Sequence, residues 1–286
     1  MKYTLNKKLA AAVMTLFFII SAATVCFAGE VTDNGAKVSF LSGMNAWEMP
    51  SLSSQEKSLL KFLVGVADTG AETTTHTASA ADMSGIGGMS RDGFSSVLRK
   101  DMDILLNTLC GNAFYNQVAS GIKVDYSLES NGNVTGVSTT MSGSGCQAIA
   151  GANDRYKATQ SKLAGMLVSE AGVTPEDSQV EALRKVNYWI TTGFTYDEGA
   201  YGYTVDQALD TKRGVCGQMS QIMKFSCDYL GIPCDLIADG QMGHAYNRVT
   251  VGGNTYYIDS TWNNTNGNPD GWFLKTASEF AVDHCI

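Results

Sequence analysis

The chain has 286 residues, of which 44% are hydrophobic, and its formal net charge is −8. That length is enough for one large domain or two modest ones. The acidic balance argues against nucleic acid or anionic lipid as the main partner.

The first residues predict a secretory leader. Lys2, Lys7 and Lys8 give a basic start, an apolar run covers residues 9–20, and small residues lead to Ala28. The run is short for a membrane span, and its end suits cleavage after Ala28. We therefore expect removal of residues 1–28 and a mature chain that is secreted or at the cell surface. The alternative is a retained amphiphilic anchor. No later run is long and apolar enough to span a bilayer.

Two helices are predicted in the first part of the mature chain. One covers residues 53–66, where a serine and a glutamate three positions later form a capping-box pattern and apolar residues recur on one face. The other covers residues 90–111, with apolar residues at helical spacing and a glycine placed to end it. Residues 69–90 between them are small and polar, without a sustained period, and predict a loop.

The spacing of the apolar residues then changes to the alternation typical of a β-hairpin. Residues 122–128 alternate, Asn131-Gly132 supplies a turn, and Val134 begins a second extended run. Helical spacing returns over residues 156–167. The region 29–171 is thus expected to be mostly helical with one hairpin, and its sequence indicates no chemistry.

A further helix is predicted over residues 176–190. Thr174 offers a cap, Pro175 suits the first turn, and two acids follow. The apolar stripe of this helix predicts a buried face.

Cys216 is the first residue that points to chemistry. It follows Gly214-Val215 and opens a stretch with apolar residues at helical spacing, which Gly231-Ile232-Pro233 stops. A cysteine at a helix N-terminus meets unpaired amides and the positive end of the dipole, which favour the thiolate. The same amides could hold the oxyanion of a tetrahedral intermediate. The alternatives for an isolated cysteine are a disulfide half and a small core residue.

Two strands downstream supply the partners that a thiol nucleophile needs. Residues 244–251 alternate, Gly252-Gly253 can turn, and residues 254–259 return. A two-residue turn makes His244 a diagonal neighbour of Asp259 on the same face. The imidazole could then take the thiol proton, and the carboxylate could orient the imidazole.

Taken together, these motifs resemble the core of the transglutaminase-like superfamily. The matching pieces are Gly-Val-Cys ending at Cys216, Gly231-Ile232, His-Ala-Tyr-Asn beginning at His244, and Asp-Ser-Thr-Trp beginning at Asp259. The resemblance covers roughly 172 to the end, so we expect a catalytic domain over residues 172–286. It implies an α+β, papain-like fold, in which a helix bearing the cysteine packs on an antiparallel sheet bearing histidine and aspartate.

The resemblance also implies acyl transfer through a thioester at Cys216. Members include peptidases, amidases, protein cross-linkers and some inactive domains. We expect a cysteine hydrolase acting on amide bonds of peptide, protein or cell-wall peptide. The alternatives are a cross-linking transglutaminase, in which an amine resolves the thioester, and a non-catalytic surface binding module.

Several other residues carry weaker expectations. Residues 194–197 and the helix at 176–190 also resemble the family's segment upstream of the cysteine, which makes Tyr196 a candidate second oxyanion donor. Tyr246 and Trp262 should lie near the site, and His284 is expected to be structural. No metal site or cofactor is expected, because the histidines are scattered and no close Cys-x-x-Cys pair occurs. Spacing does not give the pairing of the six cysteines after the leader: Cys110, Cys146, Cys216, Cys227, Cys234 and Cys285.

Overall fold

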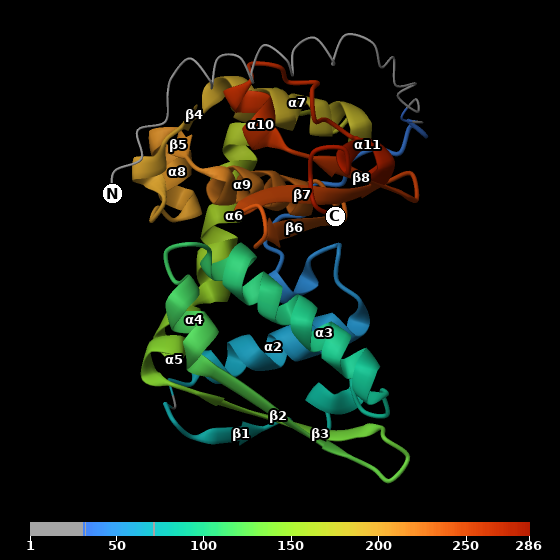
Figure 1. Ribbon diagram of the computed structural model, residues 1–286, viewed down its shortest axis with the longest axis vertical. Helices are drawn as coiled ribbons and strands as arrows, with labels where there is room; N and C mark the ends of the chain where they lie inside the picture. The colour runs from blue at the N-terminus through green and yellow to red at the C-terminus, as the bar shows by residue number, and fades with distance from the viewer. Residues whose placement is uncertain (1–30, 32, 71) are drawn as a thin grey trace, which may run out of the picture. The chain divides into compact units, whose positions relative to one another are not determined.

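The computed structural model describes Val31, residues 33–70 and residues 72–286 (Figure 1). The predicted leader, residues 1–28, lies outside the described residues. Residues Thr32–Ile286 form one compact unit. The boundary that the sequence suggests near residue 172 stays a prediction.

The first part of the described chain is mostly helical and includes one small antiparallel sheet, with strand order β1-β3-β2. Its elements are η1 (Ala46–Glu48), α2 (Ser54–Asp68), β1 (Thr75–Thr77), η2 (Asp82–Gly85), α3 (Arg91–Asp103), η3 (Ile104–Cys110), α4 (Tyr115–Gly121), β2 (Ile122–Leu128), β3 (Val134–Met141), α5 (Gly143–Ile149) and α6 (Ala152–Ser169).

The predicted helix starts and the hairpin are confirmed in this part. Ser53 caps α2 by accepting from the Glu56 amide, and Ser90 caps α3. The chain continues from α3 into the π-helical turn η3, which Gly111 ends with a φ of 62°.

The predicted loop over residues 69–90 is wrong in part. Thr75–Thr77 forms β1, which pairs with Ser138–Thr140 of β3, and Asp82–Gly85 forms a short 3-10 helix. A strand of three polar residues shows no alternation of apolar and polar side chains, so the sequence pattern does not predict it. The strand exists because β3 offers a free edge to pair with.

The second part carries a three-stranded antiparallel sheet, order β6-β7-β8, and a parallel pair, β4-β5. Its elements are α7 (Gln179–Gly193), β4 (Thr195–Tyr196), η4 (Glu198–Ala200), α8 (Val205–Thr211), β5 (Arg213–Gly214), α9 (Cys216–Tyr229), β6 (Cys234–Asp239), β7 (His244–Val251), β8 (Asn254–Ile258), α10 (Ser260–Thr265) and α11 (Ala277–Phe280).

The predicted start of α7 is wrong by a few residues. Thr174 does not cap a helix, because its amide donates to Oδ2 of Asp177 in a turn, 2.8 Å away. Lys185 also holds the Asp177 carboxylate, at 2.7 Å. The cap is Ser178, whose hydroxyl accepts from the Glu181 amide. The Ser178 hydroxyl caps the helix while it also donates to Oδ2 of Asp33 at 2.5 Å.

Helix α9 is the centre of the second part. It contacts β6 and β7 on one side and α7 and α10 on another (Figure 1). Its apolar residues Met219, Ile222 and Met223 are fully buried. This packing confirms the expected α+β core, with the helix that begins at Cys216 lying against an antiparallel sheet.

Helix α6 of the first part also packs on α9 and supplies polar contacts in the core. Lys224 and Asp228 form a buried ion pair within α9. The Tyr156 hydroxyl of α6 donates to Asp228 at 3.1 Å, and Gln160 donates to the Phe225 carbonyl at 3.0 Å. Burial raises the pKa of Asp228, Lys224 opposes that shift, and the result is about 6.

In the part of the chain that the structure describes, no helix combines the length and apolar character needed to cross a membrane.

Candidate active site

Cys216 is the first residue of α9, and its side chain is half-buried. The preceding residue, Val215, has no side-chain acceptor, so it leaves the first amides of the helix uncapped. The only contact of the capping kind runs the other way, from the Val215 amide to Oε1 of Gln218 at 3.0 Å. Among the described residues, no group outside α9 accepts from the amides of Cys216 and Gly217. Open amides thus surround the thiol.

His244 and Asp259 are set by the register of β7 and β8. Val251 pairs with Asn254 across Gly252-Gly253, whose φ values of 59° and 80° suit a two-residue hairpin turn. This is the register that the spacing predicts. The pairing ends at Ile258, so Asp259 is not part of the strand. It lies one residue beyond β8, where it caps α10.

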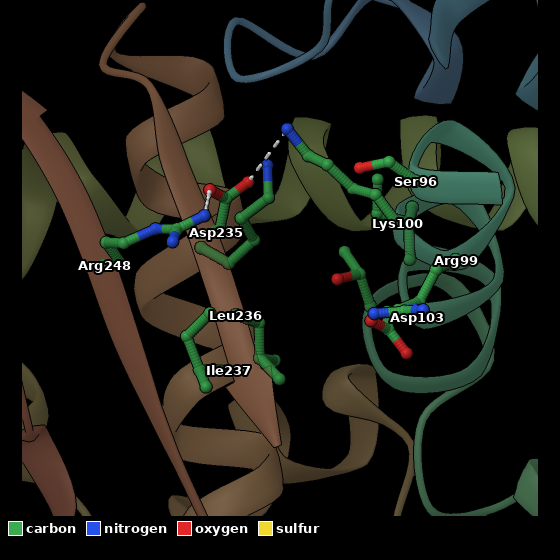
Figure 2. Close-up of a pocket in the computed structure, with 11 residues that line it drawn as sticks. Ser96, Arg99, Lys100, Asp103, Asp235, Leu236, Ile237 and Arg248 are labelled. Carbon is green, nitrogen blue, oxygen red and sulfur yellow. Dashed lines mark hydrogen bonds and ion pairs between the residues drawn. The ribbon is translucent and has the colours of Figure 1, made fainter. Parts of the chain in front are cut away.

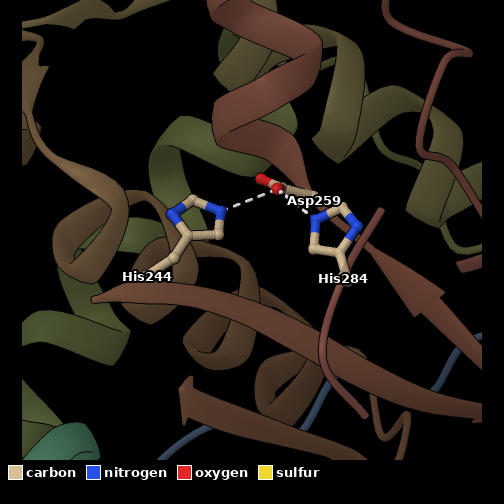
Figure 3. Close-up of side chains that lie close together, drawn as sticks. All are labelled: His244, Asp259 and His284. Carbon is tan, nitrogen blue, oxygen red and sulfur yellow. Dashed lines mark hydrogen bonds and ion pairs between the residues drawn. The ribbon is translucent and has the colours of Figure 1, made fainter. Parts of the chain in front are cut away.

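The Asp259 carboxylate is fully buried and accepts four hydrogen bonds. Oδ1 accepts from the amides of Thr261 and Trp262, each at 2.9 Å. Oδ2 accepts from Nε2 of His244 at 2.7 Å and from Nε2 of His284 at 3.0 Å (Figure 3). Burial raises the pKa of Asp259, but its hydrogen bonds with the two histidines outweigh burial and lower it. The group is therefore a carboxylate at neutral pH.

His244 connects this carboxylate to the thiol. Burial lowers the pKa of His244, but hydrogen bonds with Asp259 and then with Cys216 outweigh burial and raise it to about 9. Because Nε2 faces Asp259, Nδ1 is the nitrogen left for the sulfur. The structure thus places Cys216, His244 and Asp259 in one series: His244 is hydrogen-bonded to Asp259, and Cys216 is close enough to His244 to raise its pKa.

His284 holds the far side of Asp259, a role that the sequence did not reveal. Both of its ring nitrogens face carboxylate oxygens, because Nδ1 lies 2.7 Å from Oδ1 of Asp283. The ring is buried and stacks on Phe280, with centroids 3.7 Å apart. The one available signal was a histidine beside an acidic residue near the C-terminus, and local patterns do not show that this segment folds back onto Asp259.

Aromatic side chains surround the histidine. Trp262 stacks on His244 with centroids 5.6 Å apart, and the Tyr246 ring lies 6.4 Å away. The Tyr246 hydroxyl donates to the carbonyl of Cys285 at 2.6 Å, which ties the last residues to β7. These rings exclude water from one side of the imidazole.

Tyr196 lies on the thiol's side of the site. Its strand, β4, pairs in parallel with β5, which leads directly into α9. Burial first, and then the neighbouring Cys216, raises the pKa of Tyr196. Its side chain is 39% exposed. It is thus a partly exposed neighbour of Cys216, and its role as an oxyanion donor stays a prediction.

The cluster of His244, Asp259 and His284 offers the atoms of a metal site, but its spacing fits hydrogen bonds better. Ligands about 2 Å from a tetrahedral Zn²⁺ lie about 3.3 Å from one another. Nε2 of His244 is only 2.7 Å from Oδ2 of Asp259. Both imidazoles also reach the same oxygen. The three side chains are therefore spaced for hydrogen bonds to one another, which share protons, and not for binding Zn²⁺.

Among the described residues every cysteine is a free thiol. Cys110, Cys146, Cys227 and Cys234 are buried, and Cys285 is exposed. Cys216 thus has no disulfide partner that would block it.

A cavity of about 220 Å³ lies elsewhere, between α3 and the edge strand β6 (Figure 2). Its charged groups largely satisfy one another. Asp235 accepts from Arg248 at 2.8 Å and lies 3.6 Å from Lys100. No member of the Cys216 series lines it.

Comparison with known proteins finds a similarity over the segment that carries the site. Residues 168–273 match the transglutaminase-like superfamily, and no curated protein matches the chain. The chain is similar to the crystal structure of a TGase, with 18% identity and a TM-score of 0.32, over 50% of this chain and 45% of that one. It is also similar to a putative cysteine protease from Cytophaga hutchinsonii, with 15% identity and a TM-score of 0.31, over 50% of this chain and 63% of that one.

The matched part of the chain is the part that carries the site. The chain spans less than two thirds of the length of either solved structure. Residues 168–273, which match the transglutaminase-like superfamily, include Cys216, His244 and Asp259.

Proposed function

We propose that this protein is a secreted thiol hydrolase that cleaves amide bonds of peptide, protein or cell-wall peptide through a thioester at Cys216. The observation that carries the proposal is the hydrogen bond between His244 and the buried carboxylate of Asp259, with Cys216 beside the same imidazole. A thiol with a base, and a base with an orienting acid, is the arrangement that nucleophilic catalysis needs.

The chemistry follows from the positions of these groups. Nδ1 of His244 takes the thiol proton, and the sulfur attacks the substrate carbonyl carbon. The carbonyl electrons move to oxygen, where the open first-turn amides of α9 can stabilise the oxyanion. When the intermediate collapses, the C–N bond breaks and the amine leaves with the proton from His244. Water, deprotonated by the same imidazole, then hydrolyses the thioester.

Asp259 makes this proton transfer effective. As an acceptor of the Nε2 proton it keeps Nδ1 free to act as the base, and it stabilises the imidazolium that forms. The four donors around its oxygens keep it ionised despite burial.

The test is a screen of a labelled peptide library with the wild type beside Cys216→Ala. The exposed thiol Cys285 gives a matched control, Cys285→Ala. We expect cleavage by the wild type and the control and none by Cys216→Ala. Equal products from all three would overturn the assignment, and no product from a folded wild type would favour a binding module.

The fate of the thioester is measured separately. Ammonia release from glutamine-containing peptides is followed with and without an added primary amine. A hydrolase releases carboxylic acid in both cases, whereas incorporation of the amine would favour the cross-linking alternative.

Secretion is part of the proposal and rests on the pattern of residues 1–28. N-terminal sequencing of the protein recovered from culture medium should begin at Gly29. Recovery only with the membrane fraction, with residue 1 or 2 at the start, would favour a retained anchor.

A further inference from the structure

The first part of the chain reaches the active site at the end of η3. Helix α9 contacts η3, and Gln221 of α9 donates to the carbonyl of Thr108 at 3.0 Å. The same carboxamide packs on Gly111, where an added Cβ would lie 2.6 Å from its Nε2. The turn that follows η3 is therefore fixed against the first two turns of α9.

Asn112 is in that turn, and its side chain packs against Gly217, the residue that follows Cys216. A Cβ added to Gly217 would lie 2.9 Å from Nδ2 of Asn112, 3.3 Å from its Oδ1 and 3.4 Å from its Cγ. The whole carboxamide thus rests on the bare Cα of Gly217. It can do so because residue 217 has no side chain.

The Asn112 carboxamide has no assigned partner. It is half-buried, and its side chain makes no hydrogen bond to any residue in the described part of the chain. Neither of its amide atoms is among the buried atoms without a partner, so both are open to solvent or to a ligand. Its NH₂ group lies against Gly217, in the first turn of α9 that Cys216 begins.

We infer that Asn112 is a side-chain donor to the oxyanion formed at Cys216, supplied from outside the family-matched segment 168–273. The inference rests on the proposed function. When the sulfur adds to the carbonyl carbon, the carbonyl electrons move to oxygen. The Nδ2–H of Asn112 donates a hydrogen bond to that oxygen without transferring its proton. The amide of Cys216 or Gly217 donates beside it.

Asn112 and Tyr196 approach the thiol from different elements. Tyr196 comes from β4, next to the strand that leads into α9, and Asn112 comes from the turn after η3. Only Asn112 lies on the first turn of α9 itself. Its substitution tests the inference without touching the Cys216–His244–Asp259 series.

The experiment compares two reactions of the same thiol in the full-length protein. Acylation by 4-nitrophenyl acetate forms an oxyanion, whereas alkylation by iodoacetamide attacks a saturated carbon and forms none. Asn112→Leu keeps a similar size without a donor or a charge, and Asn112→Ala removes the amide. We expect acylation to fall on the order of 10²-fold in both variants, with alkylation unchanged. Asn116→Ala, on the exposed face of α4, is the matched control and should leave both rates as they are.

Gly217→Ala provides a second test of the same contact. Its Cβ would push the Asn112 amide aside without removing it, and should lower acylation about ten-fold. In the Asn112→Ala background the same change should add little, because the group it displaces is already gone.

The outcomes separate the inference from the proposed function. Wild-type acylation rates in both Asn112 variants would overturn the inference and leave the function intact. Equal losses in acylation and alkylation would also overturn it, because they would mean that the thiol itself had been displaced. A folded wild type that alkylates but never acylates would overturn the proposed function, and the inference with it.

Discussion

Nε2 of His284 lies 3.0 Å from Oδ2 of Asp259, on the oxygen that already accepts from His244. The buried carboxylate thus depends on a second imidazole, which Asp283 holds from behind. A hydrogen bond to a buried charge is worth about 1.5–3 kcal/mol. The protein should be sensitive to the loss of a histidine that does not reach the thiol.

His284→Ala should therefore lower the free energy of unfolding by about 1.5–3 kcal/mol at neutral pH. The pKa of Asp259 is lowered in the fold, so its contribution to stability is present above its ordinary value and lost as pH falls through the folded value. Without His284 that loss should begin at higher pH. Urea unfolding from about pH 7 down to about pH 3 checks this. If the free energy of unfolding of His284→Ala falls over the same acidic pH range as that of Cys285→Ala, the prediction is contradicted.

The reactivity of Cys216 gives a second prediction. The open helix terminus and the contact with His244 should make iodoacetamide label Cys216 faster at neutral pH than the exposed Cys285. His244→Ala should slow that labelling, because the imidazolium that pairs with the sulfur is lost. Peptide mapping after timed alkylation measures both rates. Equal rates at the two thiols would count against an activated nucleophile.

Asp259→Asn tests the orienting acid. The amide can donate as well as accept, so it can hold the wrong imidazole tautomer, and it cannot stabilise the imidazolium. The matching change in a serine protease lowers turnover about ten-thousand-fold. A thiol needs less help than a hydroxyl, so we expect acylation to fall ten- to a thousand-fold. Melting temperatures are recorded for both proteins. Unchanged acylation in the folded variant would leave a Cys216–His244 dyad.

The titration of His244 gives a prediction for alkaline pH. Its pKa is raised to about 9 from an ordinary value near 6.5, so its contribution to stability is complete below about 6.5 and is lost as pH rises through about 9. The ring resonances of His244, followed by NMR, should have their midpoint near the upper value. Asp259→Asn should move that midpoint down. A wild-type midpoint near 6.5 would mean that the two hydrogen bonds do not hold in solution.

Tyr196→Phe tests the sequence-based candidate for the oxyanion. If the hydroxyl donates, acylation by 4-nitrophenyl acetate should fall at least ten-fold while alkylation stays constant. The phenyl ring is retained, so packing around β4 should not change. The exposed Tyr201→Phe is a matched control. Acylation at the wild-type rate would remove Tyr196 from the mechanism.

The sequence predicted the parts of the fold that depend on local patterns: turns, alternation in strands, and helix starts and ends. The hairpin register followed from a two-residue glycine turn and the alternation of β7, and that register placed His244 near Asp259. The start of α9 followed from its apolar spacing and from the glycine and proline that end it. These features depend on neighbours within a few residues.

What the sequence did not predict depends on distant partners. Strand β1 has three polar residues, and only the free edge of β3 makes them a strand. The contact of His284 with Asp259 needs the C-terminal segment to fold back over β7. Asn112 reaches Gly217 because η3 packs on α9, and no periodic pattern in the sequence predicts that packing. The start of α7 was misplaced because two capping residues stood four positions apart.

The polar contacts between α6 and α9 affect whether the family-matched segment can be expressed on its own. Asp228 and Lys224 are buried in α9, and the hydroxyl that completes the pair belongs to Tyr156, outside the family-matched segment. An excised fragment that begins at residue 168 would open this ion pair to water and strip the apolar cover from the back of α9. The boundaries of the matched segment are therefore a poor guide for expression, and a fragment designed on them should aggregate although it carries Cys216, His244 and Asp259 intact.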